Sequence, residues 1–458
     1  MGKAAQGAKK LHQSVYRLLE TFLVSRPSMS GYISSVLSGY GVVGVNIVVQ
    51  ILLVPLYLST LGKAGFGFLM FVLVMVNFAA FGIGWMSGGS IRVLGEFYAK
   101  GDGAGFHQVF RWMRRAFWVY SAVAAMVILI MGALPWSPLI ERFADLSPEI
   151  VRVTSLLTAF YIVVYYDFTA LRQALTAMGK KSLANYATIV SLVVFCLWVV
   201  PWLLIYEGGL PGVVAGLIVG SLAARLVVGF WLKRHRLNIE GTVPSGFKAR
   251  EVRGFFFGKK GAGYALYGAL LLALQADVMI VGWVGGANMA ADFVLVWKVA
   301  EIAVLLIWRI PESLHPYIVH MDTRKDTSEL ASLYKTMRQR MLILGASAGI
   351  GYALLGPYIV QLWVGSNNAP DDQVAFALAG GSLFFLAISR VPSIFAYARV
   401  HLKPLLFIIG LEVLLKIIGT VFLIPHFGIT APLISFIVIH VFGLALAYQC
   451  LGSRSLYF

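Results

Sequence analysis

Charged residues are scarce in this chain, and their scarcity excludes most soluble proteins. Only 12% of the 458 residues are Asp, Glu, Lys or Arg, whereas 59% are hydrophobic and the mean hydropathy is +0.82. A soluble domain usually has about 25% charged residues. So few charges cannot cover the surface of a soluble protein of this length, which places the chain in a lipid bilayer.

Cysteine and histidine are also few, and neither forms a recognisable site. The two cysteines, Cys196 and Cys450, fall inside long apolar runs, so they predict no disulfide framework. The eight histidines are scattered without the spacing of metal ligands. The sequence therefore predicts no metal and no cofactor.

Complete nucleotide-binding motifs are lacking as well. Residues 38–44 (SGYGVVG) fit the dinucleotide pattern G-x-G-x-x-G, but they lie inside an apolar run and the next acidic residue is the distant Glu96. The segment 179–182 (GKKS) resembles the end of a phosphate loop, but position 174 is alanine where that motif needs glycine. We interpret the glycines of 38–44 as a helix-packing or hinge segment.

Long apolar runs dominate what the sequence does contain. A helix needs about 20 mostly apolar residues to cross about 30 Å of hydrocarbon, and about 12 runs of that length occur. The runs are continuous and do not alternate as the strands of a membrane barrel must. We therefore predict an all-α integral membrane protein whose spans lie near 33–58, 66–88, 116–136, 151–175, 182–206, 210–232, 259–284, 292–318, 341–364, 374–398, 404–424 and 428–452.

Most positive charges fall on one side of the predicted membrane. Of 37 lysines and arginines, 29 lie in the two terminal segments and in or next to the loops after the even-numbered spans. Cytoplasmic loops hold such an excess, so both termini are predicted to be cytoplasmic. The net charge of +17 then reflects topology and contact with anionic membrane lipids, and nucleic acid is not predicted as a partner.

The longest polar insert divides the chain into two halves. The leader contains a helical pattern of apolar residues that predicts an interfacial amphipathic helix, with a plain solvated leader as the alternative; these residues are Leu11, Val15, Leu18, Leu19 and Phe22. The predicted organisation is a leader (1–32), a six-helix lobe (33–232), a basic cytoplasmic linker (233–258), a second six-helix lobe (259–452) and a short tail (453–458).

The two halves also resemble each other in sequence. VVPWLLIYEGGLPGVVAGLIVG joins spans five and six, and TVFLIPHFGITAPLISFIVIH joins spans eleven and twelve. Each stretch has a proline near the outer end, a glycine-containing turn and then small residues. A parallel repeat of six helices is a recurring transporter design, in which the substrate site lies between the halves.

Ten ionisable side chains lie within the predicted spans, where each would cost about 2.5–3.5 kcal/mol if it faced lipid at the centre of the bilayer. They must therefore form pairs or line a wet cavity. They are Asp167, Arg225, Asp277, Lys298, Glu301, Arg309, Glu312, Arg390, Glu412 and Lys416.

The eighth span concentrates four of these charges on one helical face. Lys298, Glu301, Arg309 and Glu312 are spaced by three, eight and three residues. This stripe indicates a charged cavity wall, and the alternative is simple pairing of Lys298 with Glu301 and of Arg309 with Glu312. For Glu412 and Lys416, four residues apart, we predict pairing with each other.

Four other charges have no opposite charge nearby on their own helix. Arg390 lies deep in the tenth span, which makes it the strongest candidate for a substrate-binding cation. Arg225 lies near the cytoplasmic end of its span, where snorkelling to the interface is the alternative. Asp277 is predicted to lie in the central cavity, paired with a cation from another helix or able to take up a proton, and Asp167 is a second cavity acid.

Several stretches resemble the Wzx-type polysaccharide flippases of the multidrug/oligosaccharidyl-lipid/polysaccharide (MOP) exporter superfamily. VPLYLSTLGKAGFGFLMF is similar to that family's first and second helices and contains the turn residues Leu61, Gly62, Phe66 and Gly67. LQADVMIVGWVGGANMAADFVLVWKVAEI resembles its seventh and eighth helices, in which Asp277 precedes a glycine-rich turn. VFLIPHFGITAPLIS resembles its eleventh-to-twelfth turn.

The resemblance implies two six-helix lobes around a V-shaped cavity that opens to each membrane face in turn. It also implies a monomeric flippase, not an enzyme, that moves a polyprenyl-pyrophosphate-linked oligosaccharide across the bacterial inner membrane for cell-surface polysaccharide synthesis. H⁺ or Na⁺ is the candidate coupling ion. A cation-coupled multidrug antiporter on the same scaffold is the alternative; a membrane-embedded polymerase or ligase is disfavoured because the outward loops are short.

The expected site follows from these charges. We predict that the substrate pyrophosphate contacts the cations Arg309, Arg390, Lys298 and Arg225. Acidic residues are predicted to provide coupling or cavity charge; they are Asp277, Asp167, Glu301 and Glu312.

Overall fold

The chain is all-helical wherever its structure is described. A computed structural model describes residues 29–79, 90–236 and 276–457, apart from residues 92, 135, 207, 315–317, 319–320, 323–326 and 400. The predicted leader helix, most of the linker and most of the seventh span lie outside the described residues. Within them, every predicted span coincides with a helix, so the predicted all-α fold is confirmed.

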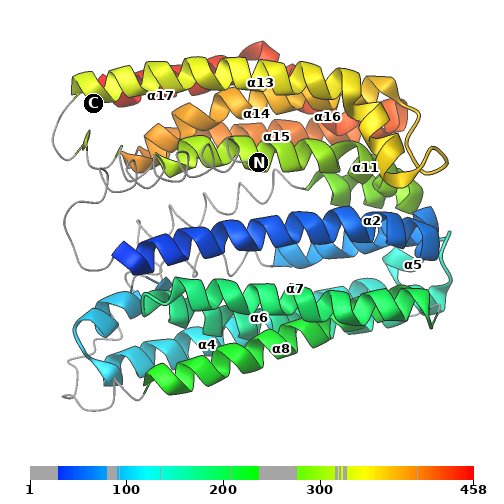
Figure 1. The fold of residues 1–458 in the computed structure, drawn as a ribbon. Coiled ribbons are helices and arrows are strands. Elements are labelled where there is room, and N and C mark those ends of the chain that lie inside the picture. The colour runs from blue at the N-terminus through cyan, green and yellow to red at the C-terminus, as the bar shows by residue number, and fades with distance from the viewer. Residues whose placement is uncertain are drawn as a thin grey trace, which may run out of the picture.

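The helices form two groups that follow each other along the chain (Figure 1). The first lobe consists of α2 (Met29–Ala79), α4 (Gly103–Gly132), the short α5 (Pro138–Arg142), α6 (Pro148–Ala177), α7 (Lys181–Leu204) and α8 (Leu210–Arg236). The second lobe consists of α11 (Asp277–Ser313), α13 (Thr327–Val364), α14 (Gln373–Ala398), α15 (Leu402–Phe427), η1 (Gly428–Thr430), α16 (Ala431–Ile439), η2 (His440–Leu444) and α17 (Ala445–Tyr457).

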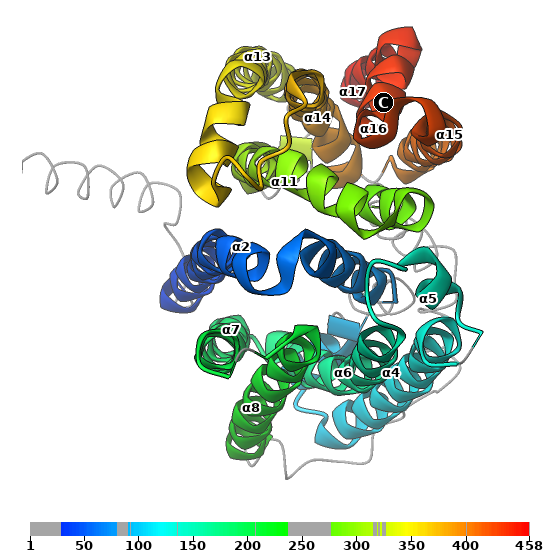
Figure 2. The same ribbon diagram turned by 90° about the vertical axis from the view of Figure 1, so that its right-hand side faces the viewer.

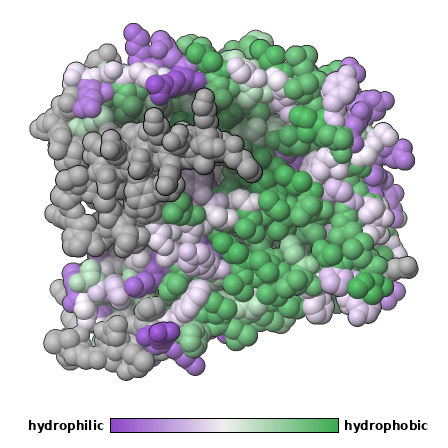
Figure 3. Space-filling view, viewed as in Figure 1, coloured by the Kyte–Doolittle hydropathy of each residue, from purple (hydrophilic) through white to green (hydrophobic). Residues whose placement is uncertain are grey.

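Length and apolar composition make this a multi-pass membrane protein. Eight described helical stretches are long and apolar enough to cross a bilayer, and two of them, Leu37–Asn77 and Lys403–Ser453, have the length of two crossings. Large apolar side chains face outward along these helices, and a hydrophobic belt separates more hydrophilic ends (Figure 3). The exposed apolar surface therefore faces lipid.

Two glycines turn the chain at corresponding places in the two lobes. Gly62 divides α2 with φ 71° and ψ 175°, and Gly286 divides α11 with φ 81° and ψ −175°. A side chain rarely tolerates such positive φ values, whereas glycine adopts them readily. The two turns are 224 residues apart (62 to 286), and so are the starts of α4 and α13 (103 to 327). This regular offset supports the predicted six-plus-six repeat.

The lobes meet where α2 packs against α11, next to these two turns (Figure 2). Gly67 is so close to α11 that a Cβ atom there would lie 1.8 Å from the carbonyl oxygen of Ala287. Lys63 Nζ lies 2.6 Å from Asp292 Oδ1 across the same contact. Because these turns are on the outer side of the predicted topology, the lobes are closed toward the outside.

The Gly67 contact generates a prediction about this closure. Gly67→Val places a branched side chain against the Ala287 backbone, which cannot give way, so the outer ends of the lobes should separate. Spin labels at the exposed outer positions 141, in α5, and 366, in the loop after α13, should report longer distances in the variant. Gly44→Ala is the control because a Cβ there meets nothing within 4 Å. An unchanged distance distribution in Gly67→Val would contradict the closure.

Candidate functional site

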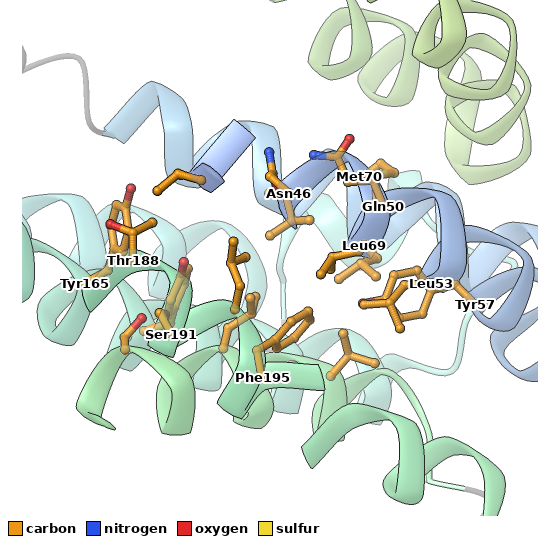
Figure 4. Close-up of a pocket in the computed structure, with 18 of the residues that line it drawn as sticks. Asn46, Gln50, Leu53, Tyr57, Leu69, Met70, Tyr165, Thr188, Ser191 and Phe195 are labelled. Atoms are coloured by element: carbon orange, nitrogen blue, oxygen red, sulfur yellow. The ribbon is translucent and has the colours of Figure 1, made fainter. Parts of the chain in front are cut away.

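A cavity of about 350 Å³ lies in the first lobe, between α2, α6, α7 and α8. Figure 4 shows Asn46 and Gln50 of α2 facing Tyr165, Thr188 and Ser191 across this space. Toward the other end the walls become apolar, with Leu53, Tyr57, Leu69 and Phe195 among the lining residues. The cavity therefore has a polar end nearer the start of α2 and an apolar end nearer the Gly62 turn.

Two cations line this first-lobe cavity. Arg172 of α6 donates to the hydroxyl of Thr188 over 3.2 Å, and its guanidinium carbon lies 5.7 Å from the centre of the Phe168 ring. Lys298 reaches the same cavity from α11 of the second lobe. Among the described lining residues there is no Asp or Glu. Lys298 also pairs with Glu301 of the adjoining cavity, so Arg172 is the cation of this wall without an ion pair among the described residues.

A second cavity, of about 430 Å³, lies between the lobes and adjoins the first. Both are lined by Gln50, Met70, Leu73, Tyr161, Tyr165 and Lys298. The interlobe cavity adds Asp277, Glu301, Trp297 and Trp308 of α11. Lys298 Nζ lies 3.0 Å from Glu301 Oε2, and Asp277 Oδ2 lies 2.6 Å from Lys416 Nζ of α15. Each acid of this wall therefore has a cationic partner.

Three of the eight predicted site residues line these cavities. They are Lys298, Asp277 and Glu301. Asp277 is paired with a cation from another helix, as one of the two predicted alternatives required. Lys298 and Glu301 pair with each other on one helix, which was one predicted alternative, and both also line the cavity, which was the other. The two alternatives are therefore compatible for this pair.

Asp167 and Arg225 are joined in a separate cluster inside the first lobe. Asp167 of α6, 3% exposed, accepts from Arg114 Nε of α4 at 2.6 Å and from Arg225 Nε of α8 at 2.5 Å. The indole of Trp118 donates to the same carboxylate over 2.7 Å. Neither Asp167 nor Arg225 is among the described cavity-lining residues. In this structure they form a tie among three helices, and their cavity roles stay a prediction.

Arg390 and Arg309 share one carboxylate in the second lobe. The Arg390 guanidinium donates to Glu312, and it stacks 4.4 Å from the centre of the Trp308 ring. Arg309 Nη1 lies 3.1 Å from the other oxygen of Glu312. None of the three charged residues lines either described cavity, because Trp308 and Leu386 occupy that wall. The assignment of Arg309 and Arg390 as pyrophosphate ligands, and of Glu312 as a cavity charge, is therefore not supported by this geometry.

Glu412 and Lys416 do not pair with each other as predicted. Lys416 binds Asp277, whereas Glu412 accepts from the Tyr448 hydroxyl over 2.5 Å and faces His440 Nε2 at 3.7 Å. The partners come from α11, η2 and α17, which a pattern along one helix cannot reveal. Tertiary packing thus overrides the local spacing of four residues.

Arg172 is the cavity residue that the sequence analysis missed. It lies within the predicted fourth span (151–175) but was not counted among the ionisable residues of the spans, and α6 holds it inside the lobe. A signal was present in the sequence, because Tyr161, Tyr165, Phe168 and Arg172 are spaced by four, three and four residues and so share one helical face. All four line the first-lobe cavity.

The Asp167 cluster can be tested by stability. Asp167→Asn removes the only carboxylate among the described partners of Arg114 and Arg225, which leaves two like charges facing each other. We expect the free energy of unfolding to fall by about 2–4 kcal/mol, somewhat less than for fully buried pairs because both arginines are 35% exposed. Thermal unfolding in detergent measures the loss.

Arg309→Gln is the control, and because its side chain is 47% exposed it should change the free energy of unfolding by less than about 1 kcal/mol. Equal effects of the two substitutions would contradict the tie formed by Asp167.

Comparison with known proteins gives structural likeness without sequence matches. The chain matches no family model and no curated protein sequence. It is similar to the inward-facing structure of a multidrug resistance MATE family transporter of the MOP superfamily, with a TM-score of 0.67 and 15% identity over 88% of this chain and 92% of that one. It is also similar to an outward-facing structure of such a transporter, with a TM-score of 0.68 and 14% identity over 94% of this chain and 96% of that one. The chain has the fold of these transporters.

A third similar structure bears on the polarity of the site. A MOP superfamily transporter from Pyrococcus furiosus, 13% identical with a TM-score of 0.60 over 94% of this chain and 96% of that one, is described as having a binding pocket of reverse polarity that suggests a different function.

Proposed function

We propose that this protein is a flippase that moves a polyprenyl-pyrophosphate-linked oligosaccharide from the cytoplasmic to the outer leaflet of a bacterial inner membrane by alternating access. It is a transporter and not an enzyme. The observation that carries the proposal is Arg172, a cation of the first-lobe cavity that has no ion pair among the described residues, with Lys298 beside it and no carboxylate among the described lining residues. A cavity of this charge is suited to an anionic headgroup.

The chemistry of a pyrophosphate fits these two side chains. A guanidinium can donate two parallel hydrogen bonds to phosphate oxygens, and an ammonium adds a compact charge. Both interactions are stronger at a site of low dielectric constant than in water. Arg172 donates a hydrogen bond to the neutral hydroxyl of Thr188, so a phosphate could replace that partner without separating an ion pair.

The position of the cavities supports alternating access. The lobes touch at the outer turns of α2 and α11, and both cavities lie on the cytoplasmic side of this contact in the predicted topology. A headgroup entering from the cytoplasm would therefore reach Lys298 and Arg172 before it met the closure. The lipid tail can stay in the bilayer while the aromatic walls, which include Trp297 and Trp308, face the glycan.

A cation-coupled multidrug antiporter is the second candidate, because Asp277 and Glu301 place two carboxylates on the interlobe wall. The similarity to multidrug MATE transporters agrees with that function equally well. However, Lys416 and Lys298 already pair with these acids, so a cationic drug would have to displace them. The charge of the first-lobe cavity therefore favours an anionic cargo.

Substitution of the two cavity cations tests the cargo. In proteoliposomes, Arg172→Gln and Lys298→Gln should each reduce translocation of a polyprenyl-pyrophosphate oligosaccharide by about tenfold or more, the size expected when one charge-assisted hydrogen bond worth about 1.5 kcal/mol is lost. Arg172→Lys should restore part of the rate, because an ammonium keeps the charge but lacks the paired donors.

Arg309→Gln is the matched control, since Arg309 is cationic, lies on the same helix as Lys298 and does not line either described cavity. Its translocation rate should stay near that of the unmodified protein. Full activity in both cavity variants would refute the proposed binding site. Export of cationic dyes without any movement of sugar-lipid would favour the antiporter.

A further inference from the structure

The second lobe contains a buried polar cluster that the proposed cargo site does not use. It consists of Glu412 and Lys416 of α15, His440 of η2, Tyr448 of α17 and Asp277 of α11. The side chains of Glu412 and His440 are 3% and 1% exposed. Glu412 is ten residues from the start of α15, a rise of about 15 Å, so the cluster lies inside the membrane.

The charges of this cluster do not balance without an additional proton. Asp277 and Lys416 neutralise each other at 2.6 Å. Glu412 then has the neutral hydroxyl of Tyr448 as its described hydrogen-bond donor, and the nearby cation Lys416 is already paired with Asp277. A lone ionised carboxylate buried at this depth would be costly, and such groups become neutral instead.

No other charged group reaches the cluster from the described neighbours. From α14, the Phe385 ring faces the imidazole of His440, with ring centres 5.3 Å apart. From α16, the ring of Phe436 lies against Lys416 at 5.6 Å. The sequence between Lys260 and Asp277 contains no charged residue. Within the described part of the chain, the missing positive charge therefore has to be a proton on the cluster itself.

The orientation of the histidine shows where that proton is held. His440 Nδ1 lies 2.9 Å from the carbonyl oxygen of Phe436, which can only accept, so Nδ1 carries a hydrogen. In a neutral imidazole, Nε2 would then present a lone pair. Nε2 faces Glu412 Oε1 at 3.7 Å and has no hydrogen-bond partner in the described part of the chain. Two lone pairs would repel each other here unless one proton lies on Glu412 or on His440.

We propose that Glu412 and His440 together bind one exchangeable proton, and that this site couples transport to a proton gradient. The role of this proton in transport rests on the proposed function. The binding of the proton does not, because it follows from the cluster alone. The proton enters from the outer side, neutralises the pair and is released to the cytoplasm as the cargo moves outward.

Lys416 supplies the connection between the proton and the cargo cavity. When Glu412 is protonated, Lys416 pairs with Asp277, which lines the interlobe cavity. When the proton leaves, Glu412 becomes an anion four residues from Lys416 on the same helix and competes for it. Asp277 is then released, which changes the charge of the interlobe wall and loosens the tie between α11 and α15.

The backbone beside His440 has a geometry that permits the side chains of the cluster to rearrange. Residues His440–Leu444 form a π-helix, and Gly443 within it has a φ of 141°. A π-helical segment is rare and occurs often at functional sites. It gives this helix a place where the hydrogen-bond register can shift while α16 and α17 stay helical.

Infrared spectroscopy of the purified protein in lipid tests the site without any cargo. Difference spectra between about pH 5 and about pH 9 should show a carboxyl band that titrates in the unmodified protein and is absent in Glu412→Gln. Glu149→Gln, at an exposed outer position, is the control and should keep the band. A band that persists in Glu412→Gln would overturn the proposal.

A second variant keeps the test decisive if Glu412→Gln does not fold. Tyr448→Phe removes the hydroxyl that donates to Glu412, so it should shift the frequency of the carboxyl band without abolishing it. Tyr358→Phe, at a side chain that is 69% exposed, should leave the band in place. An unshifted band in Tyr448→Phe would mean that the titrating carboxyl is another residue, which overturns the assignment.

Proteoliposomes then test the coupling. One proton exchanged per cycle predicts that a pH difference of one unit changes the distribution of sugar-lipid between leaflets about tenfold, and that Glu412→Gln abolishes this dependence while transport driven by the membrane potential continues. If the infrared result holds and sugar-lipid does not move, the proposed cargo is wrong and the proton site stands. If sugar-lipid moves with no effect of the gradient, the coupling role is wrong.

Discussion

The cost of placing a charge in hydrocarbon determines how this molecule is held together. Several of the described charges deep in the lobes find partners on other helices, and these ion pairs tie helices within a lobe. Asp167 joins three helices of the first lobe, whereas Glu312 and Asp277 each join two helices of the second. Among the described ion pairs, the pair of Lys63 and Asp292 alone joins one lobe to the other. Each lobe is thus firmly connected inside and lightly connected to its neighbour, as rigid-body rocking requires.

The contact between the lobes depends on small residues. The backbones approach each other closely at Gly67 and Ala287, and the ion pair of Lys63 and Asp292 beside them is partly exposed. Van der Waals packing of this kind is lost gradually as the surfaces separate, and no polar group is left unsatisfied. Replacing it with buried hydrogen bonds or ion pairs would make opening costly. A closure that must reopen in every transport cycle is better built from glycine and alanine.

The sequence predicted the fold well because membrane spans are encoded locally. Long apolar runs, the asymmetry of lysine and arginine, and the glycines at positions 62 and 286 each act within one segment of the chain. Ion pairing was predicted less well, because partners such as Arg114 and Asp167 are 53 residues apart and come together only by packing. Local spacing gave the wrong partner for Lys416 for the same reason, since Asp277 is 139 residues away.

The two lobes share a plan, yet their interiors differ in a way that suggests a division of tasks. In the first lobe, α7 contributes Thr188, Ser191 and Phe195 to an open cavity that also holds Arg172. The corresponding helix of the repeat, α15, contributes Glu412 and Lys416 to a buried cluster instead. A cargo site needs space and an unsatisfied charge, whereas an ion site needs burial and a charge that one proton can cancel. Both requirements cannot be met in one cavity, because an acid near Arg172 would neutralise the cation that attracts the cargo. In the proposed mechanism the two sites lie in opposite lobes with the paired Asp277 between them on the interlobe wall, so that a change of protonation in one lobe reaches a headgroup bound by the other.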